Sequence, residues 1–135
     1  MPRIQETHDL FRDAELARVA RMPVLLAVTQ THCGHCQLLK REVLDPMVLS
    51  GDYADRALLR ELVLDRSGPL RDFDGVSRPV AEIAGRYRAR LTPTVLLLSP
   101  DGAMLVDAIV GVNTLEMYSY YLDEAIAQAL GKLRR

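Results

Sequence analysis

The stretch from residue 24 to residue 44, VLLAVTQTHCGHCQLLKREVL, decides the fold. Val24–Val28 is an uninterrupted apolar run, which is typical of a strand buried on both faces at the centre of a sheet. Thr31–His35 is predicted to be a short loop, and from Cys36 to Leu44 the apolar residues return at helical spacing. The two cysteines, Cys33 and Cys36, therefore lie between a buried strand and the start of a helix.

Helical spacing of apolar residues recurs on both sides of this stretch. It predicts helices over Asp9–Arg21, over Pro79–Arg88 and from Asn113 to Leu130. Asn113 with Glu116 resembles a capping box at the start of the last of these helices, and Gly131 is placed just past its end. Asp45-Pro46 suits the N-cap and first residue of a further short helix, which Gly51-Asp52 ends.

Apolar runs predict three more strands, namely the latter part of Ala57–Leu64, Thr94–Ser99 and Ala103–Val110. The turn Pro100-Asp101-Gly102 makes the last two a hairpin, which places an antiparallel strand at the edge of the sheet. The earlier strands are separated by helices, which implies parallel crossovers. The segment Asp65–Arg78 is rich in Asp, Gly, Ser and Pro, which predicts a loop with Asp72–Asp74 as a solvated turn.

This order, α-β-α-β-α-β-β-α, predicts the α/β class, with a mixed central sheet flanked by helices on both faces. We expect residues 1–135 to form a single domain, because the chain has about one domain's length and 49% hydrophobic against 26% charged residues. The 17 basic and 18 acidic residues give no basic face, so nucleic acid is excluded as an expected partner.

Membrane association is not expected either, since no apolar run approaches the roughly 20 residues of a membrane span. The first residues, Met1–Asp13, lack the basic and apolar regions of a signal peptide. Two possibilities remain, a cytosolic protein or one whose targeting segment is not part of this chain.

The cysteine pair is expected to serve chemistry and not stability, because a three-residue separation closes too small a loop to constrain the unfolded chain. At a helix N-terminus, unpaired N–H groups and the positive end of the dipole lower the pKa of Cys33 and favour its thiolate, the form that attacks disulfides. Cys36, one turn later, is expected to be more buried and to resolve the mixed disulfide. Gly34 is expected to allow a tight backbone turn, and His35 to stabilise the thiolate and make the disulfide a better oxidant.

Three other interpretations of the pair stay open. The cysteines could form an inert disulfide, or the chain could be a redox-silent docking domain. They could also bind copper or zinc together with His32 or His35, although a single Cys-X-X-Cys is only half of a typical zinc site.

These residues resemble the thioredoxin superfamily. Cys33-Gly34-His35-Cys36 after a buried strand matches the active site of protein disulfide isomerases, and Thr92-Pro93-Thr94 before a strand resembles the superfamily's cis-proline loop. That loop lies against the cysteines and pairs with the substrate backbone. Asp72-Phe73-Asp74-Gly75 and Ala84-Gly85-Arg86-Tyr87, followed by the proline loop, look like the bacterial SoxW-like periplasmic thioredoxins.

The resemblance implies a thioredoxin-like fold with an enlarged loop before the helix that precedes the cis-proline. It implies a thiol–disulfide oxidoreductase that acts on cysteine-containing protein substrates, uses a redox partner protein and needs no bound cofactor. Thr92 and Pro93 are expected to contact the substrate. His32 is expected to contact it too because of its position directly before Cys33, and it is either an exposed loop residue or a second electrostatic partner for the Cys33 thiolate. We expect a monomer in the periplasm, with a cytosolic location still open.

The sequence departs from the superfamily pattern in three places. His32 replaces the usual Trp before the first cysteine, and Ala27 stands where a buried Asp usually accepts a proton beneath the second cysteine. Glu61 aligns with the usual Lys partner of that Asp on the next strand. We hypothesise that Glu61 supplies the missing carboxylate, and the alternative is a surface ion pair with Arg60 or another arginine.

Overall fold

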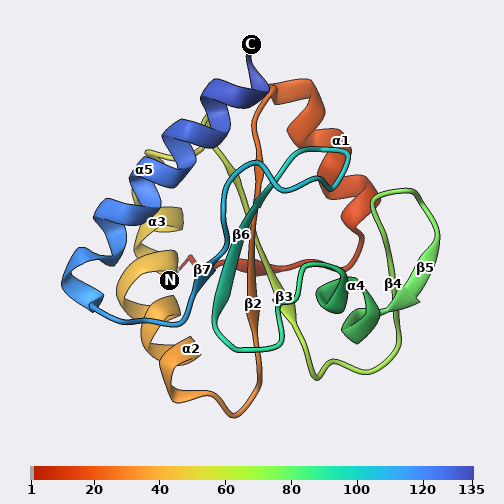
Figure 1. The fold of residues 1–135 in the computed structure, drawn as a ribbon, viewed down its shortest axis with the longest axis horizontal. Helices are drawn as coiled ribbons and strands as arrows, with labels where there is room; N and C mark the ends of the chain where they lie inside the picture. The colour runs from red at the N-terminus through yellow and green to blue at the C-terminus, as the bar shows by residue number, and fades with distance from the viewer. Residues whose placement is uncertain (1) are drawn as a thin grey trace.

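The central sheet is mixed, as predicted, and Figure 1 shows it in a computed structural model that describes residues 2–135. Its five strands lie in the order β1-β3-β2-β6-β7. The first three of these run parallel, whereas β6 is antiparallel to β2 and β7 is antiparallel to β6. The strands comprise Gln5–Glu6 (β1), Val24–Thr29 (β2), Leu58–Val63 (β3), Thr94–Leu98 (β6) and Ile109–Val110 (β7).

Helices cover both faces of the sheet, and β2 lies at its centre (Figure 1). The helical elements comprise Leu10–Ala20 (α1), Gly34–Leu39 (α2), the π-helical turn Lys40–Leu44, Asp45–Ser50 (α3), Val80–Arg86 (α4) and Leu115–Leu133 (α5). The side chains of alternate residues of β2 pack into two different hydrophobic clusters. Leu26 and Val28 pack in the cluster that contains α1 and α4. Leu25 and Ala27 pack in the cluster that contains residues of α2, α3 and α5. All six residues of β2 are buried, in agreement with its continuous apolar run.

The parallel crossover expected before the strand at residue 94 is wrong, because β6 runs antiparallel to β2. The connection from β3 to β6 does not cross the sheet, because residues 64–93 form a separate hairpin and the short helix α4 in place of one long crossover helix. β6 begins at the end of the sheet where β2 finishes, since Thr94 pairs with Val28.

The segment 65–78, predicted to be a loop, contains two short strands that form a separate hairpin, β4 (Pro69–Arg71) and β5 (Ser77–Pro79). The solvated turn expected at Asp72–Asp74 is also wrong for its first two residues, since Asp72 is 1% and Phe73 is 8% exposed. Its carboxylate accepts hydrogen bonds from Arg78 and Arg86. These contacts tie the enlarged segment to α4.

Several helix boundaries differ from the predicted ones because contacts distant in sequence decide them. Asp45 is no N-cap: α2, the π-helical turn and α3 follow without a break, and its carboxylate accepts the Ile4 N–H at 2.9 Å. Pro79 is the N-cap of α4 and not its first residue, and α4 ends at Arg86.

The last helix also differs from its prediction at both ends. Its N-cap is Thr114 instead of Asn113, with no side-chain capping bond. The helix continues through Gly131 to Leu133, where Lys132 donates to the Leu105 carbonyl oxygen at 2.7 Å. Within the predicted strand 103–110, only β7 and a single bridge at Met104 form.

Candidate active site

Cys33 and Cys36 form a disulfide at the start of α2, the point where the chain leaves β2. Cys33 is the N-cap of α2 in extended conformation, and its Sγ accepts the Cys36 N–H at 3.1 Å. The helix therefore begins at Gly34, two residues earlier than predicted. An N-cap sulfur receives the helix's free N–H groups, and these stabilise negative charge on it.

The two sulfurs differ in their access to solvent. Cys33 is partly exposed, whereas Cys36 is fully buried, with an exposed fraction of 0%. The relative burial expected from the sequence is confirmed. A partner molecule can reach Cys33 from solvent, while Cys36 can be reached only through Cys33.

The two residues between the cysteines are exposed, and the tight turn expected at Gly34 is absent. Gly34 is the first residue of α2 and has no positive φ. A Cβ added there would meet no atom within 4 Å, so no contact within the chain requires glycine at this position. His35 and the preceding His32 both face solvent.

The structure lends no support to a metal site at the pair. Within residues 2–135, no three His, Cys, Asp or Glu side chains come together in a way that could hold a metal ion.

The loop before β6 lies directly against Cys33. The Thr92-Pro93 peptide bond is cis, as the resemblance implies. The Thr92 hydroxyl lies 3.5 Å and its carbonyl oxygen 3.7 Å from Cys33 Sγ. Gly111, just after β7, donates its N–H to the Pro93 carbonyl oxygen at 2.8 Å. The fold thus brings together the two motifs that are far apart in the sequence.

Sequence reasoning missed one neighbour of this loop. The Thr92 hydroxyl donates to Gln30 Oε1 at 3.0 Å. Gln30 follows directly after β2 and is exposed. No local pattern could have identified it, because the contact depends on how two loops pack together.

Glu61 lies on the face of the sheet that α2 covers. It pairs in register with Ala27, whose side chain packs among residues of α2, α3 and α5. The glutamate is 5% exposed, so the surface ion pair considered above is wrong. The structure pairs Arg60 with Asp13 instead, at 3.0 Å.

Two side chains bind the Glu61 carboxylate. The Thr29 hydroxyl donates to Oε2 at 2.5 Å, and Lys40 Nζ lies 3.1 Å from the same oxygen. Lys40 stands four residues after Cys36, about one turn further along the same helical segment. The superfamily's carboxylate and lysine are thus both present here, but on different elements.

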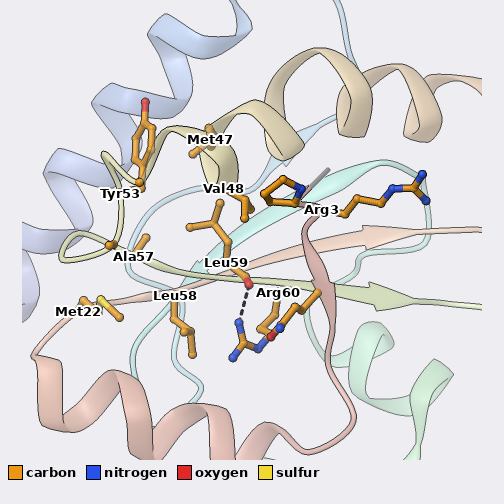
Figure 2. A pocket seen from close by; sticks show the side chains of 13 residues that line it. Arg3, Met22, Met47, Val48, Tyr53, Ala57, Leu58, Leu59 and Arg60 are labelled. Atoms are coloured by element: carbon orange, nitrogen blue, oxygen red, sulfur yellow. Dashed lines mark hydrogen bonds between the residues drawn. The ribbon is translucent and has the colours of Figure 1, made fainter.

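A hollow of about 460 Å³ lies at the other end of the sheet, where β2 and β3 begin (Figure 2). Met22, Met47 and Leu59 are among its apolar lining residues, and Arg3 and Arg60 lie at its border. It is separated from Cys33 by the length of β2. The cysteine site is therefore a surface site and does not lie in this hollow.

A disulfide across Cys-X-X-Cys at a helix N-terminus, beside a cis-proline loop, is the arrangement of a thiol–disulfide oxidoreductase. The chain belongs to the thioredoxin-like domain family, whose model matches residues 10–126. The superfamily resemblance and the predicted fold class are confirmed.

Solved thioredoxin structures share the fold at low identity. Thioredoxin O2 from Arabidopsis thaliana, in the oxidised state, is 18% identical, with 90% of this chain and 92% of that chain covered and a TM-score of 0.60. Spinach chloroplast thioredoxin f is 17% identical, with 93% of each chain covered and a TM-score of 0.61. The reduced periplasmic thioredoxin SoxS from Paracoccus pantotrophus is 23% identical, with 79% of this chain and 98% of that chain covered and a TM-score of 0.54. No curated protein sequence matches this chain.

Proposed function

We propose that this protein exchanges disulfides with cysteine-containing protein substrates, with Cys33 as the nucleophile and Cys36 as the resolving cysteine. One observation carries the proposal: a partly exposed sulfur at a helix N-terminus, backed by a fully buried partner and lying beside the Thr92-Pro93 loop. An inert disulfide would not need a solvent-facing sulfur next to a loop of this kind.

In the reducing direction, the Cys33 thiolate attacks one sulfur of a substrate disulfide. A Cys33–substrate bond forms, the substrate's own S–S bond breaks, and the released substrate thiolate takes up a proton. Cys36 then loses its proton and attacks Cys33 Sγ. The Cys33–Cys36 bond forms, the Cys33–substrate bond breaks, and the second substrate sulfur leaves as a thiolate that takes up a proton, so two electrons pass from the protein to the substrate. The oxidising direction is the reverse.

Glu61 is the group proposed to accept the proton of Cys36. A buried thiol loses its proton reluctantly in apolar surroundings, so a nearby acceptor accelerates the resolving attack. The buried position of Glu61 on the α2 face of the sheet supports this role. Thr29 and Lys40 would orient the carboxylate.

The remaining site residues are assigned to substrate binding and redox poise. Thr92 and Pro93 would pair with the substrate backbone, and the exposed His32 would contact the substrate beside Cys33. His35 would stabilise the Cys33 thiolate and shift the protein to the oxidising side of about −270 mV, the value for thioredoxin. Gly34, with open space around its Cα, would leave room for the substrate chain.

No bound cofactor is required, because the dithiol itself carries the electrons between the substrate and a redox partner protein. We propose a monomer in the periplasm. The resemblance given above and the fold shared with a periplasmic thioredoxin support this location. The described residues contain no helix with the length and hydrophobicity needed to cross a membrane.

The test uses Cys36→Ser and Cys33→Ser as a matched pair. Cys36→Ser retains the nucleophile and lacks the resolving thiol, so it should accumulate mixed disulfides with a disulfide-containing reporter peptide. Cys33→Ser should accumulate far fewer, because its remaining sulfur is buried. Non-reducing electrophoresis and mass spectrometry measure both. Equal trapping by the two variants, or no turnover of the reporter by the wild type with dithiothreitol, would overturn the proposal.

A further inference from the structure

We propose that Gln30 is a positioning residue that competes with the Cys33 sulfur for the hydrogen of the Thr92 hydroxyl, and thereby tunes the redox poise of the pair. This inference rests on the proposed function above. It concerns how the site is tuned and not whether the cysteines react.

The geometry gives the Thr92 hydroxyl two acceptors. Gln30 Oε1 lies 3.0 Å from Thr92 Oγ1, and Cys33 Sγ lies 3.5 Å from it. A hydroxyl carries a single hydrogen, so it can serve only one of them fully at a time. In the disulfide form the Cys33 sulfur is neutral and a weak acceptor, and the amide oxygen of Gln30 receives the bond.

Reduction reverses this preference. A Cys33 thiolate carries a full negative charge, and charge-assisted hydrogen bonds are roughly twice as strong as neutral ones. A small rotation of the Thr92 hydroxyl then directs its hydrogen to the sulfur. Gln30 is exposed, so water replaces the lost bond at its amide oxygen with little penalty. The Gln30 contact therefore stabilises the disulfide form relative to the thiolate form.

The surrounding framework can hold Gln30 in place through both states. The next residue, Thr31, donates its N–H to Asp65 Oδ1 at 3.1 Å, which fastens the loop after β2 to the end of β3. Other charged, titratable and polar groups also face the site, and all of them are present in every variant compared below. They are His32 and His35 beside Cys33, Asp65 on the adjoining loop, the Glu61–Lys40 pair beneath α2 and the Thr92 carbonyl oxygen 3.7 Å from Cys33 Sγ.

Removing the side-chain amide of Gln30 removes the competing acceptor, so the Thr92 hydroxyl should donate its hydrogen bond to Cys33 Sγ. In Gln30→Ala we expect the pKa of the Cys33 thiol to fall. We also expect the equilibrium constant against glutathione to shift about two- to threefold toward the reduced protein, the lower range for a net hydrogen bond because the contact is exposed. Gln30→Glu has the same length but only accepts, and it adds a negative charge, so it should shift both quantities in the opposite direction.

The decisive measurement repeats Gln30→Ala in a Thr92→Val background. Without the hydroxyl there is no hydrogen to release, so the substitution should change neither the thiolate absorbance titration of Cys33 nor the glutathione equilibrium. Thr92→Ser restores the hydroxyl and should restore the effect of Gln30→Ala. Thermal unfolding of each variant serves as the folding control.

An equal shift with and without the Thr92→Val substitution, or no shift in either background, would overturn the role of Gln30. Both readouts are made on the protein with glutathione alone, without a protein substrate. Failure of reporter turnover in the wild type would contradict the proposed function, whereas absence of coupling between Gln30 and Thr92 would contradict only this inference.

Discussion

Asp72 and Glu61 are two buried carboxylates whose surroundings differ in the number of hydrogen-bond donors. Asp72, next to β4, accepts bonds from both nitrogens of the Arg86 fork, from Arg78 at 2.8 Å and from the Phe73 N–H at 2.8 Å. Burial alone would raise the pKa of Asp72. These hydrogen bonds and the two positive charges outweigh it and hold the pKa below its ordinary value.

Glu61 has far fewer donors, one hydroxyl from Thr29 and one ammonium from Lys40, both on the same oxygen. A carboxylate offers about four acceptor positions, so Glu61 keeps acceptor positions open, while Asp72 is close to saturated. The comparison teaches that two buried carboxylates can differ in how many fixed donors hold them. The proton-accepting role proposed for Glu61 depends on these open positions.

The largest expected effect comes from Asp72→Ala, which leaves Arg86 and Arg78 without their shared anion. Breaking a buried ion pair from one side costs about 3–5 kcal/mol, and the partial exposure of both arginines places this case near the lower limit. Urea unfolding measures the loss. Disulfide exchange should stay intact, because the cluster does not touch Cys33. Asp74→Ala is the control, since Asp74 is exposed in the same hairpin and should cost much less. Equal losses would contradict the distinction.

The second-largest expected effect is on the reduction potential of the Cys33–Cys36 pair, and it involves neither Asp72 nor Glu61. In His35→Pro the exposed imidazole is lost, and with it the stabilisation expected for the Cys33 thiolate. We predict that the reduction potential falls by tens of millivolts, where about 30 mV is a tenfold change in the equilibrium constant. Equilibration with glutathione followed by thiol alkylation measures it. An unchanged or higher potential would remove His35 from its assigned role.

Glu61→Gln tests the proton-accepting role proposed for Glu61, a role that Asp72 does not have in the proposal. We expect the resolving step to slow by about five- to tenfold at neutral pH, within the lower range for loss of a general base. The difference should shrink at alkaline pH, where hydroxide removes the Cys36 proton. Stopped-flow release from a preformed Cys33–peptide mixed disulfide gives the rates. Identical pH profiles for variant and wild type would exclude Glu61 as the acceptor.

The sequence predicts the principal elements because their patterns are long. The apolar run of β2 and the helical spacing of α1 and α5 extend over five or more residues. In contrast, β1 has two residues and β4 and β5 have three each, which is too short for any periodicity. The last turn of α5 includes Gly131 and carries Lys132, which donates to the carbonyl oxygen of Leu105, a contact distant in sequence that no helix-end rule could include.

Some residues of the candidate site can likewise be predicted from local motifs, whereas the contacts of others are decided only in the folded chain. The cysteines and Pro93 stand in local motifs, so the sequence identifies them directly. Only the resemblance to the superfamily points to Glu61 in the sequence. Its burial and its pairing with Lys40 follow from strand register and from the π-helical turn that carries the lysine. The contact between Gln30 and Thr92 joins two loops whose packing is decided only in the folded chain.

The smallest expected effect concerns a third carboxylate, Asp123, which is only partly buried and has a single neutral donor. The Tyr53 hydroxyl, at the border of the hollow in Figure 2, donates to it. Burial and this hydrogen bond raise the pKa of Tyr53 to about 12. A raised folded-state pKa gives stability that is complete below the ordinary value near 10 and is lost as the pH rises through 12. Tyr53→Phe should therefore cost about 1 kcal/mol at neutral pH and lose less stability than the wild type between these two pH values. Parallel alkaline unfolding curves for the two proteins would show that Asp123 contributes nothing through Tyr53.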